Sequence, residues 1–299
     1  RVLADRLLSP QGLGPTPDRF EELLAALERH ATVVASLRHK GSGRLPVEMF
    51  ATFASPGDAE RRPTLLFLHG KGGNASEWEP DAVRALTLGY NVLLPDLRAH
   101  GKSGGTFFTL GFLERDDLSL GIEAARVEFG LDPERIGIHS CSAGSFVALE
   151  FAANRPGIRA IWLESPFAEP REMARHYLSR WTGVPAPLLT LASRWAVARA
   201  VARVRHELGV GDGSGGLAQL DPLRAVARVN APILLVHGGN DRLVPPRFTL
   251  RLASALPPGS EVWNPTRAGH CHHEDEPERV MKEEYDRRWK AFFLKYLPV

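Results

Sequence analysis

The sequence contains little that would place it in a specialised class of protein. Only two of its 299 residues are cysteines, Cys141 and Cys271, so no disulfide framework is indicated and a reducing compartment is permitted. No apolar run approaches the ~18 residues of a membrane-spanning helix. The net charge is +2 and no dense run of lysine and arginine occurs, which argues against nucleic acid as a partner. With 43% hydrophobic residues, the chain is expected to bury a globular core.

The start of the sequence leaves the compartment open. The chain begins at Arg1 and not at a methionine, so a signal peptide or an anchor could have been removed ahead of it. The low cysteine content favours the cytoplasm. Membrane contact and oligomeric state are left open by the sequence.

From residue 64 onward, short apolar runs alternate with longer amphipathic stretches. Stretches such as FLERDDLSLGIEAARVEF space apolar residues three and four positions apart, as crossover helices do. The alternation predicts an α/β fold in which helices cover both faces of a parallel sheet. Ahead of it, ATVVASLR and PVEMFATFA predict an antiparallel hairpin at the sheet edge. The runs typical of strands buried on both faces are TLLFLHG, NVLLPD, RIGIHS, AIWLES and ILLVHG.

The patterning predicts three parts of the chain. Residues 1–44 would supply an amino-terminal helix and an edge strand, and residues 45–167 and 221–299 the α/β core. Residues 168–220 contain no strand pattern but do contain arginine-rich helical segments, which predicts a helical lid over the end of the sheet.

The stretch Ser140-Cys141-Ser142-Ala143-Gly144 joins a predicted strand directly to a predicted helix. Small residues on both sides of a serine at such a turn allow strand and helix to approach closely and project the hydroxyl from a strained corner. The pattern matches the G-x-S-x-G nucleophile elbow, with Ser140 in place of the first glycine. Ser142 is therefore the candidate nucleophile.

A serine hydroxyl is a weak nucleophile and requires a base and a group that orients the base. Asp241 follows the predicted strand ILLVHG, and His270 follows the last predicted strand, so the chain order is serine, acid, histidine. After TLLFL, the backbone N–H of Lys71 could point at an oxyanion together with that of Ala143. Four elements thus occur in the order that a serine hydrolase needs.

Through FLHGKGG, PDLRAHGKSGG, HSCSAGS, HGGNDRLVP and AGHCHHEDEP, the sequence resembles the α/β-hydrolase superfamily over residues 45 to about 297. The resemblance implies a mostly parallel eight-stranded sheet flanked by helices, a lid at residues 168–220, a triad of Ser142, Asp241 and His270, and an oxyanion hole at Lys71 and Ala143. The sequence departs from the family pattern at Ser140, where glycine is usual, and at Ala99, where glycine is common. Neither departure removes a catalytic atom.

Serine at the elbow narrows the chemistry, because relatives that open epoxides carry aspartate there and dienelactone-hydrolase-like enzymes carry cysteine. Serine favours hydrolysis of a small-molecule carboxylic ester through an acyl-enzyme, as esterases and lipases perform it. Such a mechanism requires no cofactor and no metal. Apolar residues of the lid would line a pocket for an apolar acyl group or pack the lid onto the body. They are Trp181, Leu188, Leu189, Leu191 and Trp195.

Three alternatives remain open at this point. A peptidase or amidase would need a carboxylate to hold a substrate amine, and Glu169 or Glu172 in the lid could supply it. An acyltransferase would use the same triad with an alcohol in place of water. A non-catalytic binding protein that kept the fold is less favoured, because the triad is intact.

Other signals have simpler interpretations. GDGSGG (Gly211, Gly213, Gly216) follows no strand and is expected to be a loop and not a dinucleotide site. The run His270-Cys271-His272-His273 has no second ligand cluster, so no metal site is predicted.

The remaining polar residues are expected to be structural. Cys141 and Cys271 flank the proposed nucleophile and base, which leaves a disulfide or a redox switch open as an alternative. Adjacent side chains on a tight turn usually point apart, so two partly buried free thiols are the favoured prediction. The histidines of the two His-Gly pairs, His69 and His237, are interpreted as structural. Asp116 and Asp117 are expected to be solvated or capping, and Asp96 and Arg98 to brace the loop after their strand.

Overall fold

The computed structural model describes residue 9 and residues 18–43, 47–208, 221–271 and 279–299. Its strands are β1 (Val33–Lys40), β2 (Glu48–Ser55), β3 (Thr64–Leu68), β4 (Asn91–Asp96), β5 (Ile136–Cys141), β6 (Ile158–Glu164), β7 (Ile233–Val236) and β8 (Glu261–Trp263). Its α-helices are α2 (Phe20–Glu28), α3 (Glu79–Thr87), α4 (Glu114–Phe129), α5 (Ala143–Ala152), α6 (Pro170–Thr182), α7 (Thr190–Leu208), α8 (Pro222–Val226), α9 (Leu250–Ala253) and α10 (Arg279–Tyr296).

All eight strands form one sheet in the order β1-β2-β4-β3-β5-β6-β7-β8. Strand β2 runs antiparallel to β1 and to β4, whereas β4, β3, β5, β6, β7 and β8 pair in parallel. The predicted eight-stranded, mostly parallel sheet and its antiparallel edge hairpin are confirmed. Parallel strands place their carboxyl ends along one edge, so the loops that follow β3, β5 and β7 meet there.

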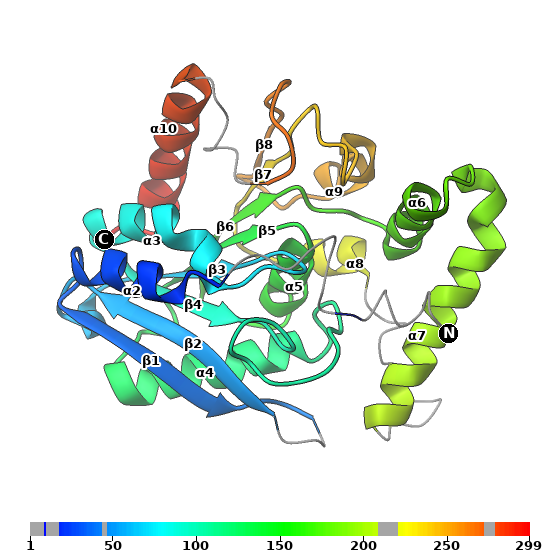
Figure 1. The fold of residues 1–299 in the computed structure, drawn as a ribbon. Helices are drawn as coiled ribbons and strands as arrows, with labels where there is room; N and C mark the ends of the chain where they lie inside the picture. Colours follow the sequence, from blue (N-terminus) through cyan, green and yellow to red (C-terminus); the bar gives the residue numbers. More distant parts are fainter. Residues whose placement is uncertain (1–8, 10–17, 44–46, 209–220, 272–278) are drawn as a thin grey trace.

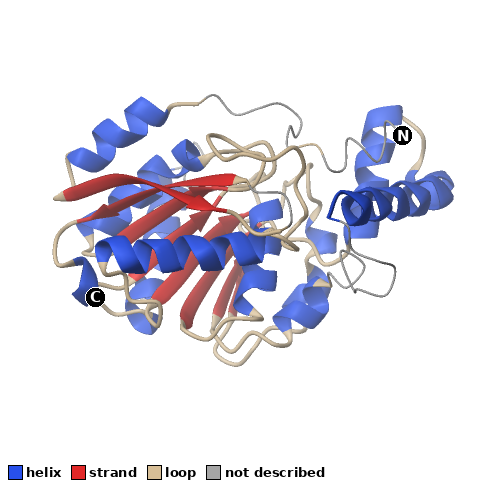
Figure 2. Ribbon diagram, turned by 90° about the horizontal axis from the view of Figure 1, so that it is seen from below, coloured by secondary structure: helices blue, strands red, loops and turns tan. Residues whose placement is uncertain are grey.

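Helices cover both faces of the sheet (Figures 1 and 2). Strand β3 shows why, since Leu66 and Leu68 point into one buried apolar cluster and Leu65 and Phe67 into another. The first cluster takes residues from α4, α5, α8 and α9, and the second from α2, α3 and α10. A strand buried on both faces has no polar alternation, which is why its sequence is a continuous apolar run.

The described part of the predicted lid is helical. Helices α6 and α7, with the short 3-10 helix η3 (Ala186–Leu189), lie beyond α5 and α8 to one side of the sheet (Figure 1). Residues 209–220 of that segment, including Gly211, Gly213 and Gly216, fall outside the described residues. Among the described residues, none of the helices has both the length and the apolar character that crossing a bilayer requires.

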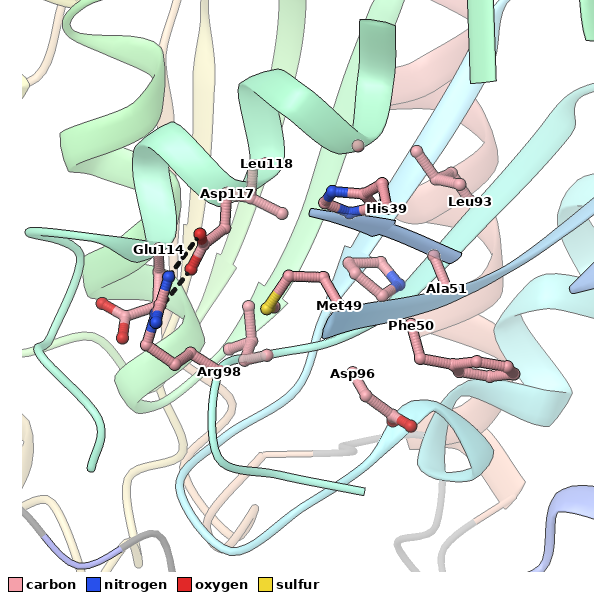
Figure 3. Close-up of a pocket in the computed structure, with 13 residues that line it drawn as sticks. His39, Met49, Phe50, Ala51, Leu93, Asp96, Arg98, Glu114, Asp117 and Leu118 are labelled. Carbon is pink, nitrogen blue, oxygen red and sulfur yellow. Dashed lines mark hydrogen bonds and ion pairs between the residues drawn. The ribbon is translucent and has the colours of Figure 1, made fainter. Parts of the chain in front are cut away.

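A buried ion pair joins the loop after β4 to α4 (Figure 3). The Arg98 guanidinium donates to both carboxylate oxygens of Asp117, at 2.7 and 2.8 Å, and also to the backbone carbonyl of Ser42. Only 3% of the Asp117 side chain is exposed, against 59% for Asp116. The prediction of a solvated or capping aspartate pair is therefore wrong for Asp117, because Arg98, from a distant part of the chain, turns toward it.

Candidate active site

The candidate nucleophile lies in a strained turn between β5 and α5. Ser142 has φ 52° and ψ −119°, a conformation that a residue with a side chain rarely adopts, and its N–H donates to the Glu164 carbonyl at 2.8 Å. A Cβ at Gly144 would lie 2.4 Å from the carbonyl oxygen of Leu68 and 2.5 Å from that of His69. The close approach of helix and strand explains why glycine follows the serine by two residues.

The two departures from the family pattern have local explanations. At the elbow, the Ser140 hydroxyl fits because it is hydrogen-bonded, 3.2 Å from the Ser145 hydroxyl and 3.3 Å from the Trp162 carbonyl. In the loop after β4, Ala99 has a φ of 64°. That conformation favours glycine, so alanine is tolerated there at some cost in backbone strain.

The structure brings the candidate acid and base into direct contact. The Nδ1 atom of His270 lies 2.7 Å from Oδ2 of Asp241, while Oδ1 of Asp241 accepts from the N–H groups of Leu243 and Val244 at 2.9 and 2.8 Å. The Asp241 side chain is buried, whereas 20% of the His270 side chain is exposed. Burial by itself would raise the pKa of Asp241, but hydrogen bonds from His237 and His270 outweigh it and hold that pKa below its usual range. Asp241 is thus a carboxylate that can orient an imidazole.

Two glycines allow the loop after β7, which carries Asp241 (the acid loop), to pack closely against the loop after β8, which carries His270 (the histidine loop). A Cβ on Gly238 would meet the carbonyl oxygens of Gly269 and Ala268 at 2.1 and 2.3 Å, and one on Gly239 would meet that of Thr266 at 2.6 Å. The Asn240 N–H donates to the Ala268 carbonyl at 3.0 Å. The Gly-Gly pair before the acid therefore sets the distance over which Asp241 reaches His270.

The loop after β3 lies over the nucleophile turn. A Cβ on Gly70 would be 3.4 Å from the Cβ of Ser142 and 3.6 Å from the Sγ of Cys141. Lys71 follows Gly70 directly, and Ala143 begins α5, whose first-turn N–H groups lack acceptors within the helix. Burial lowers the pKa of the Lys71 amine to about 8. The N–H groups of Lys71 and Ala143 remain the predicted oxyanion donors, and the roles of Ser142, Asp241 and His270 likewise remain predictions.

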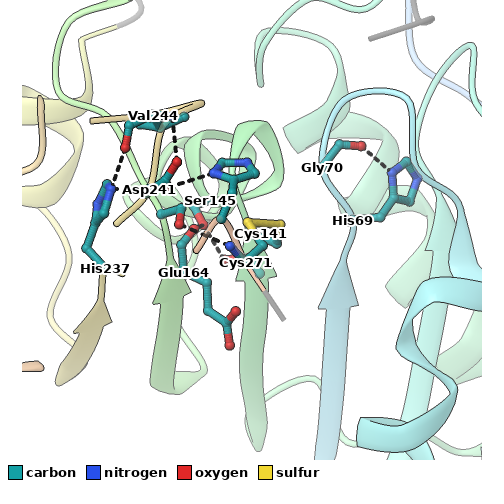
Figure 4. Close-up of a disulfide and its surroundings, with 12 residues drawn as sticks. His69, Gly70, Cys141, Ser145, Glu164, His237, Asp241, Val244 and Cys271 are labelled. Carbon is teal, nitrogen blue, oxygen red and sulfur yellow. Dashed lines mark hydrogen bonds and ion pairs between the residues drawn. A yellow bond between two sulfur atoms is a disulfide. The ribbon is translucent and has the colours of Figure 1, made fainter. Parts of the chain in front are cut away.

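The structure corrects the prediction of two free thiols, because Cys141 and Cys271 form a disulfide (Figure 4). Their Cα atoms are 5.8 Å apart, within the range that a disulfide spans. Both residues are buried. The expectation that the two side chains point apart was based on Cys141 alone; it missed that the histidine loop folds back onto the elbow.

Two residues near the site were not identified as functional from the sequence. His237 contacts Asp241, with its Nε2 atom 3.3 Å from Oδ2 (Figure 4). Ser165 has a φ of 46°, and its hydroxyl accepts from the Cys271 N–H at 3.3 Å. The four-residue spacing of His237 and Asp241 in HGGND was an available signal for the first, whereas nothing in the local sequence marked the second.

Other residues near the site have structural roles. His69 is buried, its Nδ1 lies 2.8 Å from the Gly70 carbonyl, and its Nε2 accepts from the Leu97 N–H at 2.9 Å. Asp96 accepts from the N–H groups of Ala75 and Lys102, both at 2.8 Å, which braces the loop after β4 as predicted.

One group in the described part of the chain has metal-binding composition. The Sγ atoms of Cys141 and Cys271 and a ring nitrogen of His270 lie within 4.8 Å of one another. Because the two sulfurs are bonded to each other, they cannot act as the thiolates that zinc requires. His272 and His273 lie outside the described residues.

The pocket in Figure 3 lies between the β1–β2 hairpin, β4 and α4. None of the 13 residues that line it belongs to the proposed triad or oxyanion loop. The Arg98–Asp117 ion pair forms part of its wall. This pocket is therefore not the candidate active site.

Comparisons with known proteins identify the family to which the fold belongs. The model of a family described as the alpha/beta hydrolase family matches residues 65–283. The YqkD protein of Bacillus subtilis is 30% identical over 195 residues, which are 63% of this chain and 58% of that protein. A monoacylglycerol lipase of Mycolicibacterium smegmatis is 28% identical over 213 residues, covering 63% of this chain and 73% of the lipase. The chain spans less than two thirds of the length of the YqkD-like relatives that it matches.

Solved structures show the same fold. The esterase Pf2001 of Pyrococcus furiosus superposes with a TM-score of 0.69 at 20% identity, covering 97% of this chain and 99% of the esterase. The acylaminoacyl peptidase of Pyrococcus horikoshii gives a TM-score of 0.63 at 18% identity, covering 92% of this chain and 43% of the peptidase. At these identities the similarity establishes the fold and leaves the substrate open.

Proposed function

The chain belongs to the α/β hydrolase family, and from that premise we propose that it is a serine hydrolase of carboxylic esters. The observation that carries the proposal is the 2.7 Å contact of His270 with Asp241, joined through the Cys271–Cys141 bond to the turn that bears Ser142. A carboxylate, an imidazole and a hydroxyl on a strained elbow are the components of nucleophilic acyl transfer.

In the proposed mechanism, His270 takes the proton of the Ser142 hydroxyl as its oxygen attacks the ester carbonyl. Asp241 holds the imidazole by its Nδ1 atom and stabilises the imidazolium that forms. The N–H groups of Lys71 and Ala143 would receive the oxyanion, and each such donor is worth about 2.7–4 kcal/mol in comparable sites. His270 then protonates the leaving alcohol and activates the water that releases the acid.

An apolar acyl group is the proposed preference. A buried cluster of Phe146, Phe167, Met173, Val244 and Phe248 adjoins the acid loop and links α5 to α6. By contrast, Trp181, Leu188, Leu191 and Trp195 of the insertion are 47–80% exposed and Leu189 is half-buried, so these residues do not line a buried acyl pocket. The acyl preference therefore draws its support from the buried cluster and from similarity to a monoacylglycerol lipase.

The peptidase alternative receives less support from the insertion. Glu169 is ion-paired with Arg251, and a carboxylate oxygen of Glu172 lies 3.7 Å from the guanidinium of Arg175. A carboxylate that holds a substrate amine would first have to leave its arginine. The acyltransferase alternative uses the same triad and differs only in the acceptor.

The test is covalent labelling with a fluorophosphonate probe, followed by mass spectrometry of the labelled peptide. We expect the label on Ser142, lost in Ser142→Ala and in His270→Ala. Ser140→Ala is the matched control, because it removes a hydroxyl two residues away and should leave the label in place. Failure of folded wild-type protein to label would overturn the proposal in favour of the binding-protein alternative. Label on Ser142 would justify a panel of ester chain lengths, with amides and alcohol acceptors in parallel.

A further inference from the structure

The disulfide occupies an unusual place relative to the proposed triad. The only two cysteines of the chain precede Ser142 and follow His270 directly, and they are separated by 130 residues. Through this bond, the residue next to the proposed nucleophile is linked directly to the residue next to the proposed base. The path through the disulfide is therefore much shorter than the path along the backbone. The Sγ atom of Cys141 also lies against Gly70 of the oxyanion loop.

The backbone around the bond is strained at three residues, two of which are hydrogen-bonded to each other. Ser142, Ser165 and Cys271 have φ values of 52°, 46° and 55°. Such conformations cost about 1–3 kcal/mol each and persist only where the surroundings hold them. The Cys271 N–H donates to the Ser165 hydroxyl, and the disulfide holds the same residue from its side chain. The residue next to the base is thus kept in an unfavourable conformation by one hydrogen bond and one reducible bond.

From this arrangement we propose that the Cys141–Cys271 disulfide is a redox site that controls the proposed hydrolase. The oxidised form fixes His270 against the elbow and is active. In the reduced form Cys271 relaxes toward negative φ, His270 is displaced from Ser142, and turnover falls. The inference rests on the proposed function, because it regulates the same site.

The chemistry is thiol–disulfide exchange. A small dithiol attacks one sulfur, the Cys141–Cys271 bond breaks, and the second thiol of the reagent closes a new disulfide on itself. The two cysteines gain two electrons and two protons, and the dithiol loses them. Because both cysteines are buried, a small reagent is required and exchange is expected to be slow.

The experiment compares oxidised and dithiol-treated wild-type protein, with the disulfide content measured by alkylation and mass spectrometry. We expect kcat for an activated ester to fall at least ~10-fold on reduction, because a displacement of about 1 Å in a catalytic group can cost ~100-fold. Reoxidation should restore it. Full activity in protein verified as reduced would overturn the proposal, as would free thiols in the protein after oxidation.

The matched control is a Cys141→Ala, Cys271→Ala double variant. We expect the low activity of the reduced form and no response to dithiol. Hydrogen exchange of residues 266–271 supplies a readout that needs no turnover, and it should rise on reduction of the wild type only. If exchange rises but oxidised protein hydrolyses no ester, the proposed function has failed and the redox site stands. If esters are hydrolysed equally in both states, the redox control has failed.

A second, independent observation concerns His237. The Thr249 hydroxyl donates its single hydrogen to the Pro166 carbonyl at 2.6 Å, so it must accept from the Nδ1 atom of His237, with which it is also in contact. The Nε2 atom of His237 lies 2.6 Å from the Val244 carbonyl and 3.3 Å from Oδ2 of Asp241, and both are acceptors. With the threonine hydrogen on the Pro166 carbonyl, both ring nitrogens face acceptors, and this arrangement assigns a hydrogen to each of them.

We infer that His237 is a positioning residue, an imidazolium that holds Asp241 as a carboxylate aimed at His270. The hydrogen bond from His237 favours the ionised form of the Asp241 carboxyl group, whose pKa lies below its usual range. Other titratable or charged groups lie around the acid loop: His176, Tyr177 and Arg180 of α6, and Arg247 of the 3-10 helix η5 (Pro246–Phe248).

Ring-nitrogen NMR of the wild type and of His237→Gln tests this inference without turnover. We expect one histidine with both nitrogens protonated between pH 6 and 8, absent in the variant. In His237→Gln we expect kcat to fall more than KM changes. Thr249→Val, which removes the acceptor at Nδ1 together with the donor to the Pro166 carbonyl, should take the hydrogen from Nδ1 and lower kcat in the same way. A His237 ring with one unprotonated nitrogen in the wild type, or an unchanged kcat in folded His237→Gln, would contradict the inference.

Discussion

Two of the buried aspartates, Asp117 and Asp241, each contact a basic side chain, and the two pairs differ in how completely they are enclosed. Arg98, in the loop after β4, and Asp117, on α4, are 5% and 3% exposed, and Arg98 donates to both carboxylate oxygens. At the other site Asp241 is fully buried, but 20% of the His270 side chain is exposed. One pair is closed on every side, and the other presents an imidazole at the carboxyl edge of the sheet.

The difference separates a structural ion pair from a reactive one. A buried pair with all its hydrogen bonds satisfied contributes rigidity and offers nothing to a substrate. A buried acid that orients a partly exposed base can move a proton. Breaking the Arg98–Asp117 pair should therefore mainly lower stability, whereas breaking the His270–Asp241 pair should mainly lower activity.

The largest effect is expected on activity when the partly exposed His270–Asp241 pair is broken. Asp241→Asn keeps the shape of the side chain but no longer orients and stabilises the imidazole as a carboxylate does, so we expect kcat to fall by roughly 10⁴-fold. Steady-state hydrolysis of an activated ester measures it. If Asp117→Asn lowered kcat of the folded protein to the same extent, the distinction between the two pairs would be lost.

The second largest effect is expected on stability when the buried Arg98–Asp117 pair is broken. Asp117→Asn leaves the Arg98 guanidinium buried without its counter-charge, which typically costs about 3–5 kcal/mol in the free energy of unfolding. Urea denaturation measures it, with Asp116→Asn as the matched control because Asp116 is 59% exposed and should change stability little. Equal losses in the two variants would refute the assignment.

A smaller effect is expected from two buried histidines beside the oxyanion loop. Burial lowers the pKa of His69 and of His100 to about 4 from 6.5. The unfolded chain then binds more protons than the folded chain between pH 6.5 and 4, so the free energy of unfolding should fall as pH falls through that window. The slope should be about 1 kcal/mol per pH unit for each histidine, measured by denaturation at pH 5, 6 and 7. A flat profile from pH 7 to pH 5 would mean that neither ring is neutral and enclosed.

The smallest effect distinguishes two glycines. Gly183, at the end of α6, has a φ of 73° and nothing within 4 Å of an added Cβ, so Gly183→Ala should cost only about 1 kcal/mol of backbone strain. Gly144→Ala would push a methyl group into the backbone of β3, which we expect to cost about 1–3 kcal/mol or more and to lower fluorophosphonate labelling as well. Thermal denaturation compares them. Labelling by Gly144→Ala at the wild-type rate would show that the elbow tolerates a wider turn.

Local sequence patterns were sufficient for the sheet and for the order of the proposed triad. The apolar runs around Leu66 and Leu235 identify strands because strands buried on both faces leave no choice of residue type. Asp117 was misjudged because its partner Arg98 is on another element, and the helical pattern around it cannot show which side chain meets it. Cys141 and Cys271 were misjudged because the positive φ at Ser142 and at Cys271 redirects the chain. The contact of His237 with Asp241 likewise depends on how the loop after β7 closes.

The Cys141–Cys271 bond also has a topological consequence. Together with the 130-residue separation of its ends, it closes a covalent ring that runs through α5, β6, the insertion helices, β7 and β8. The exposed chain between α6 and η3, at Gly183 to Pro185, lies inside that ring and offers a site for a protease. A single cut there would open the ring without separating the molecule, so a nicked protein should migrate as one species until it is reduced. The proposed nucleophile and base would then be on different polypeptides, joined to each other by sulfur alone.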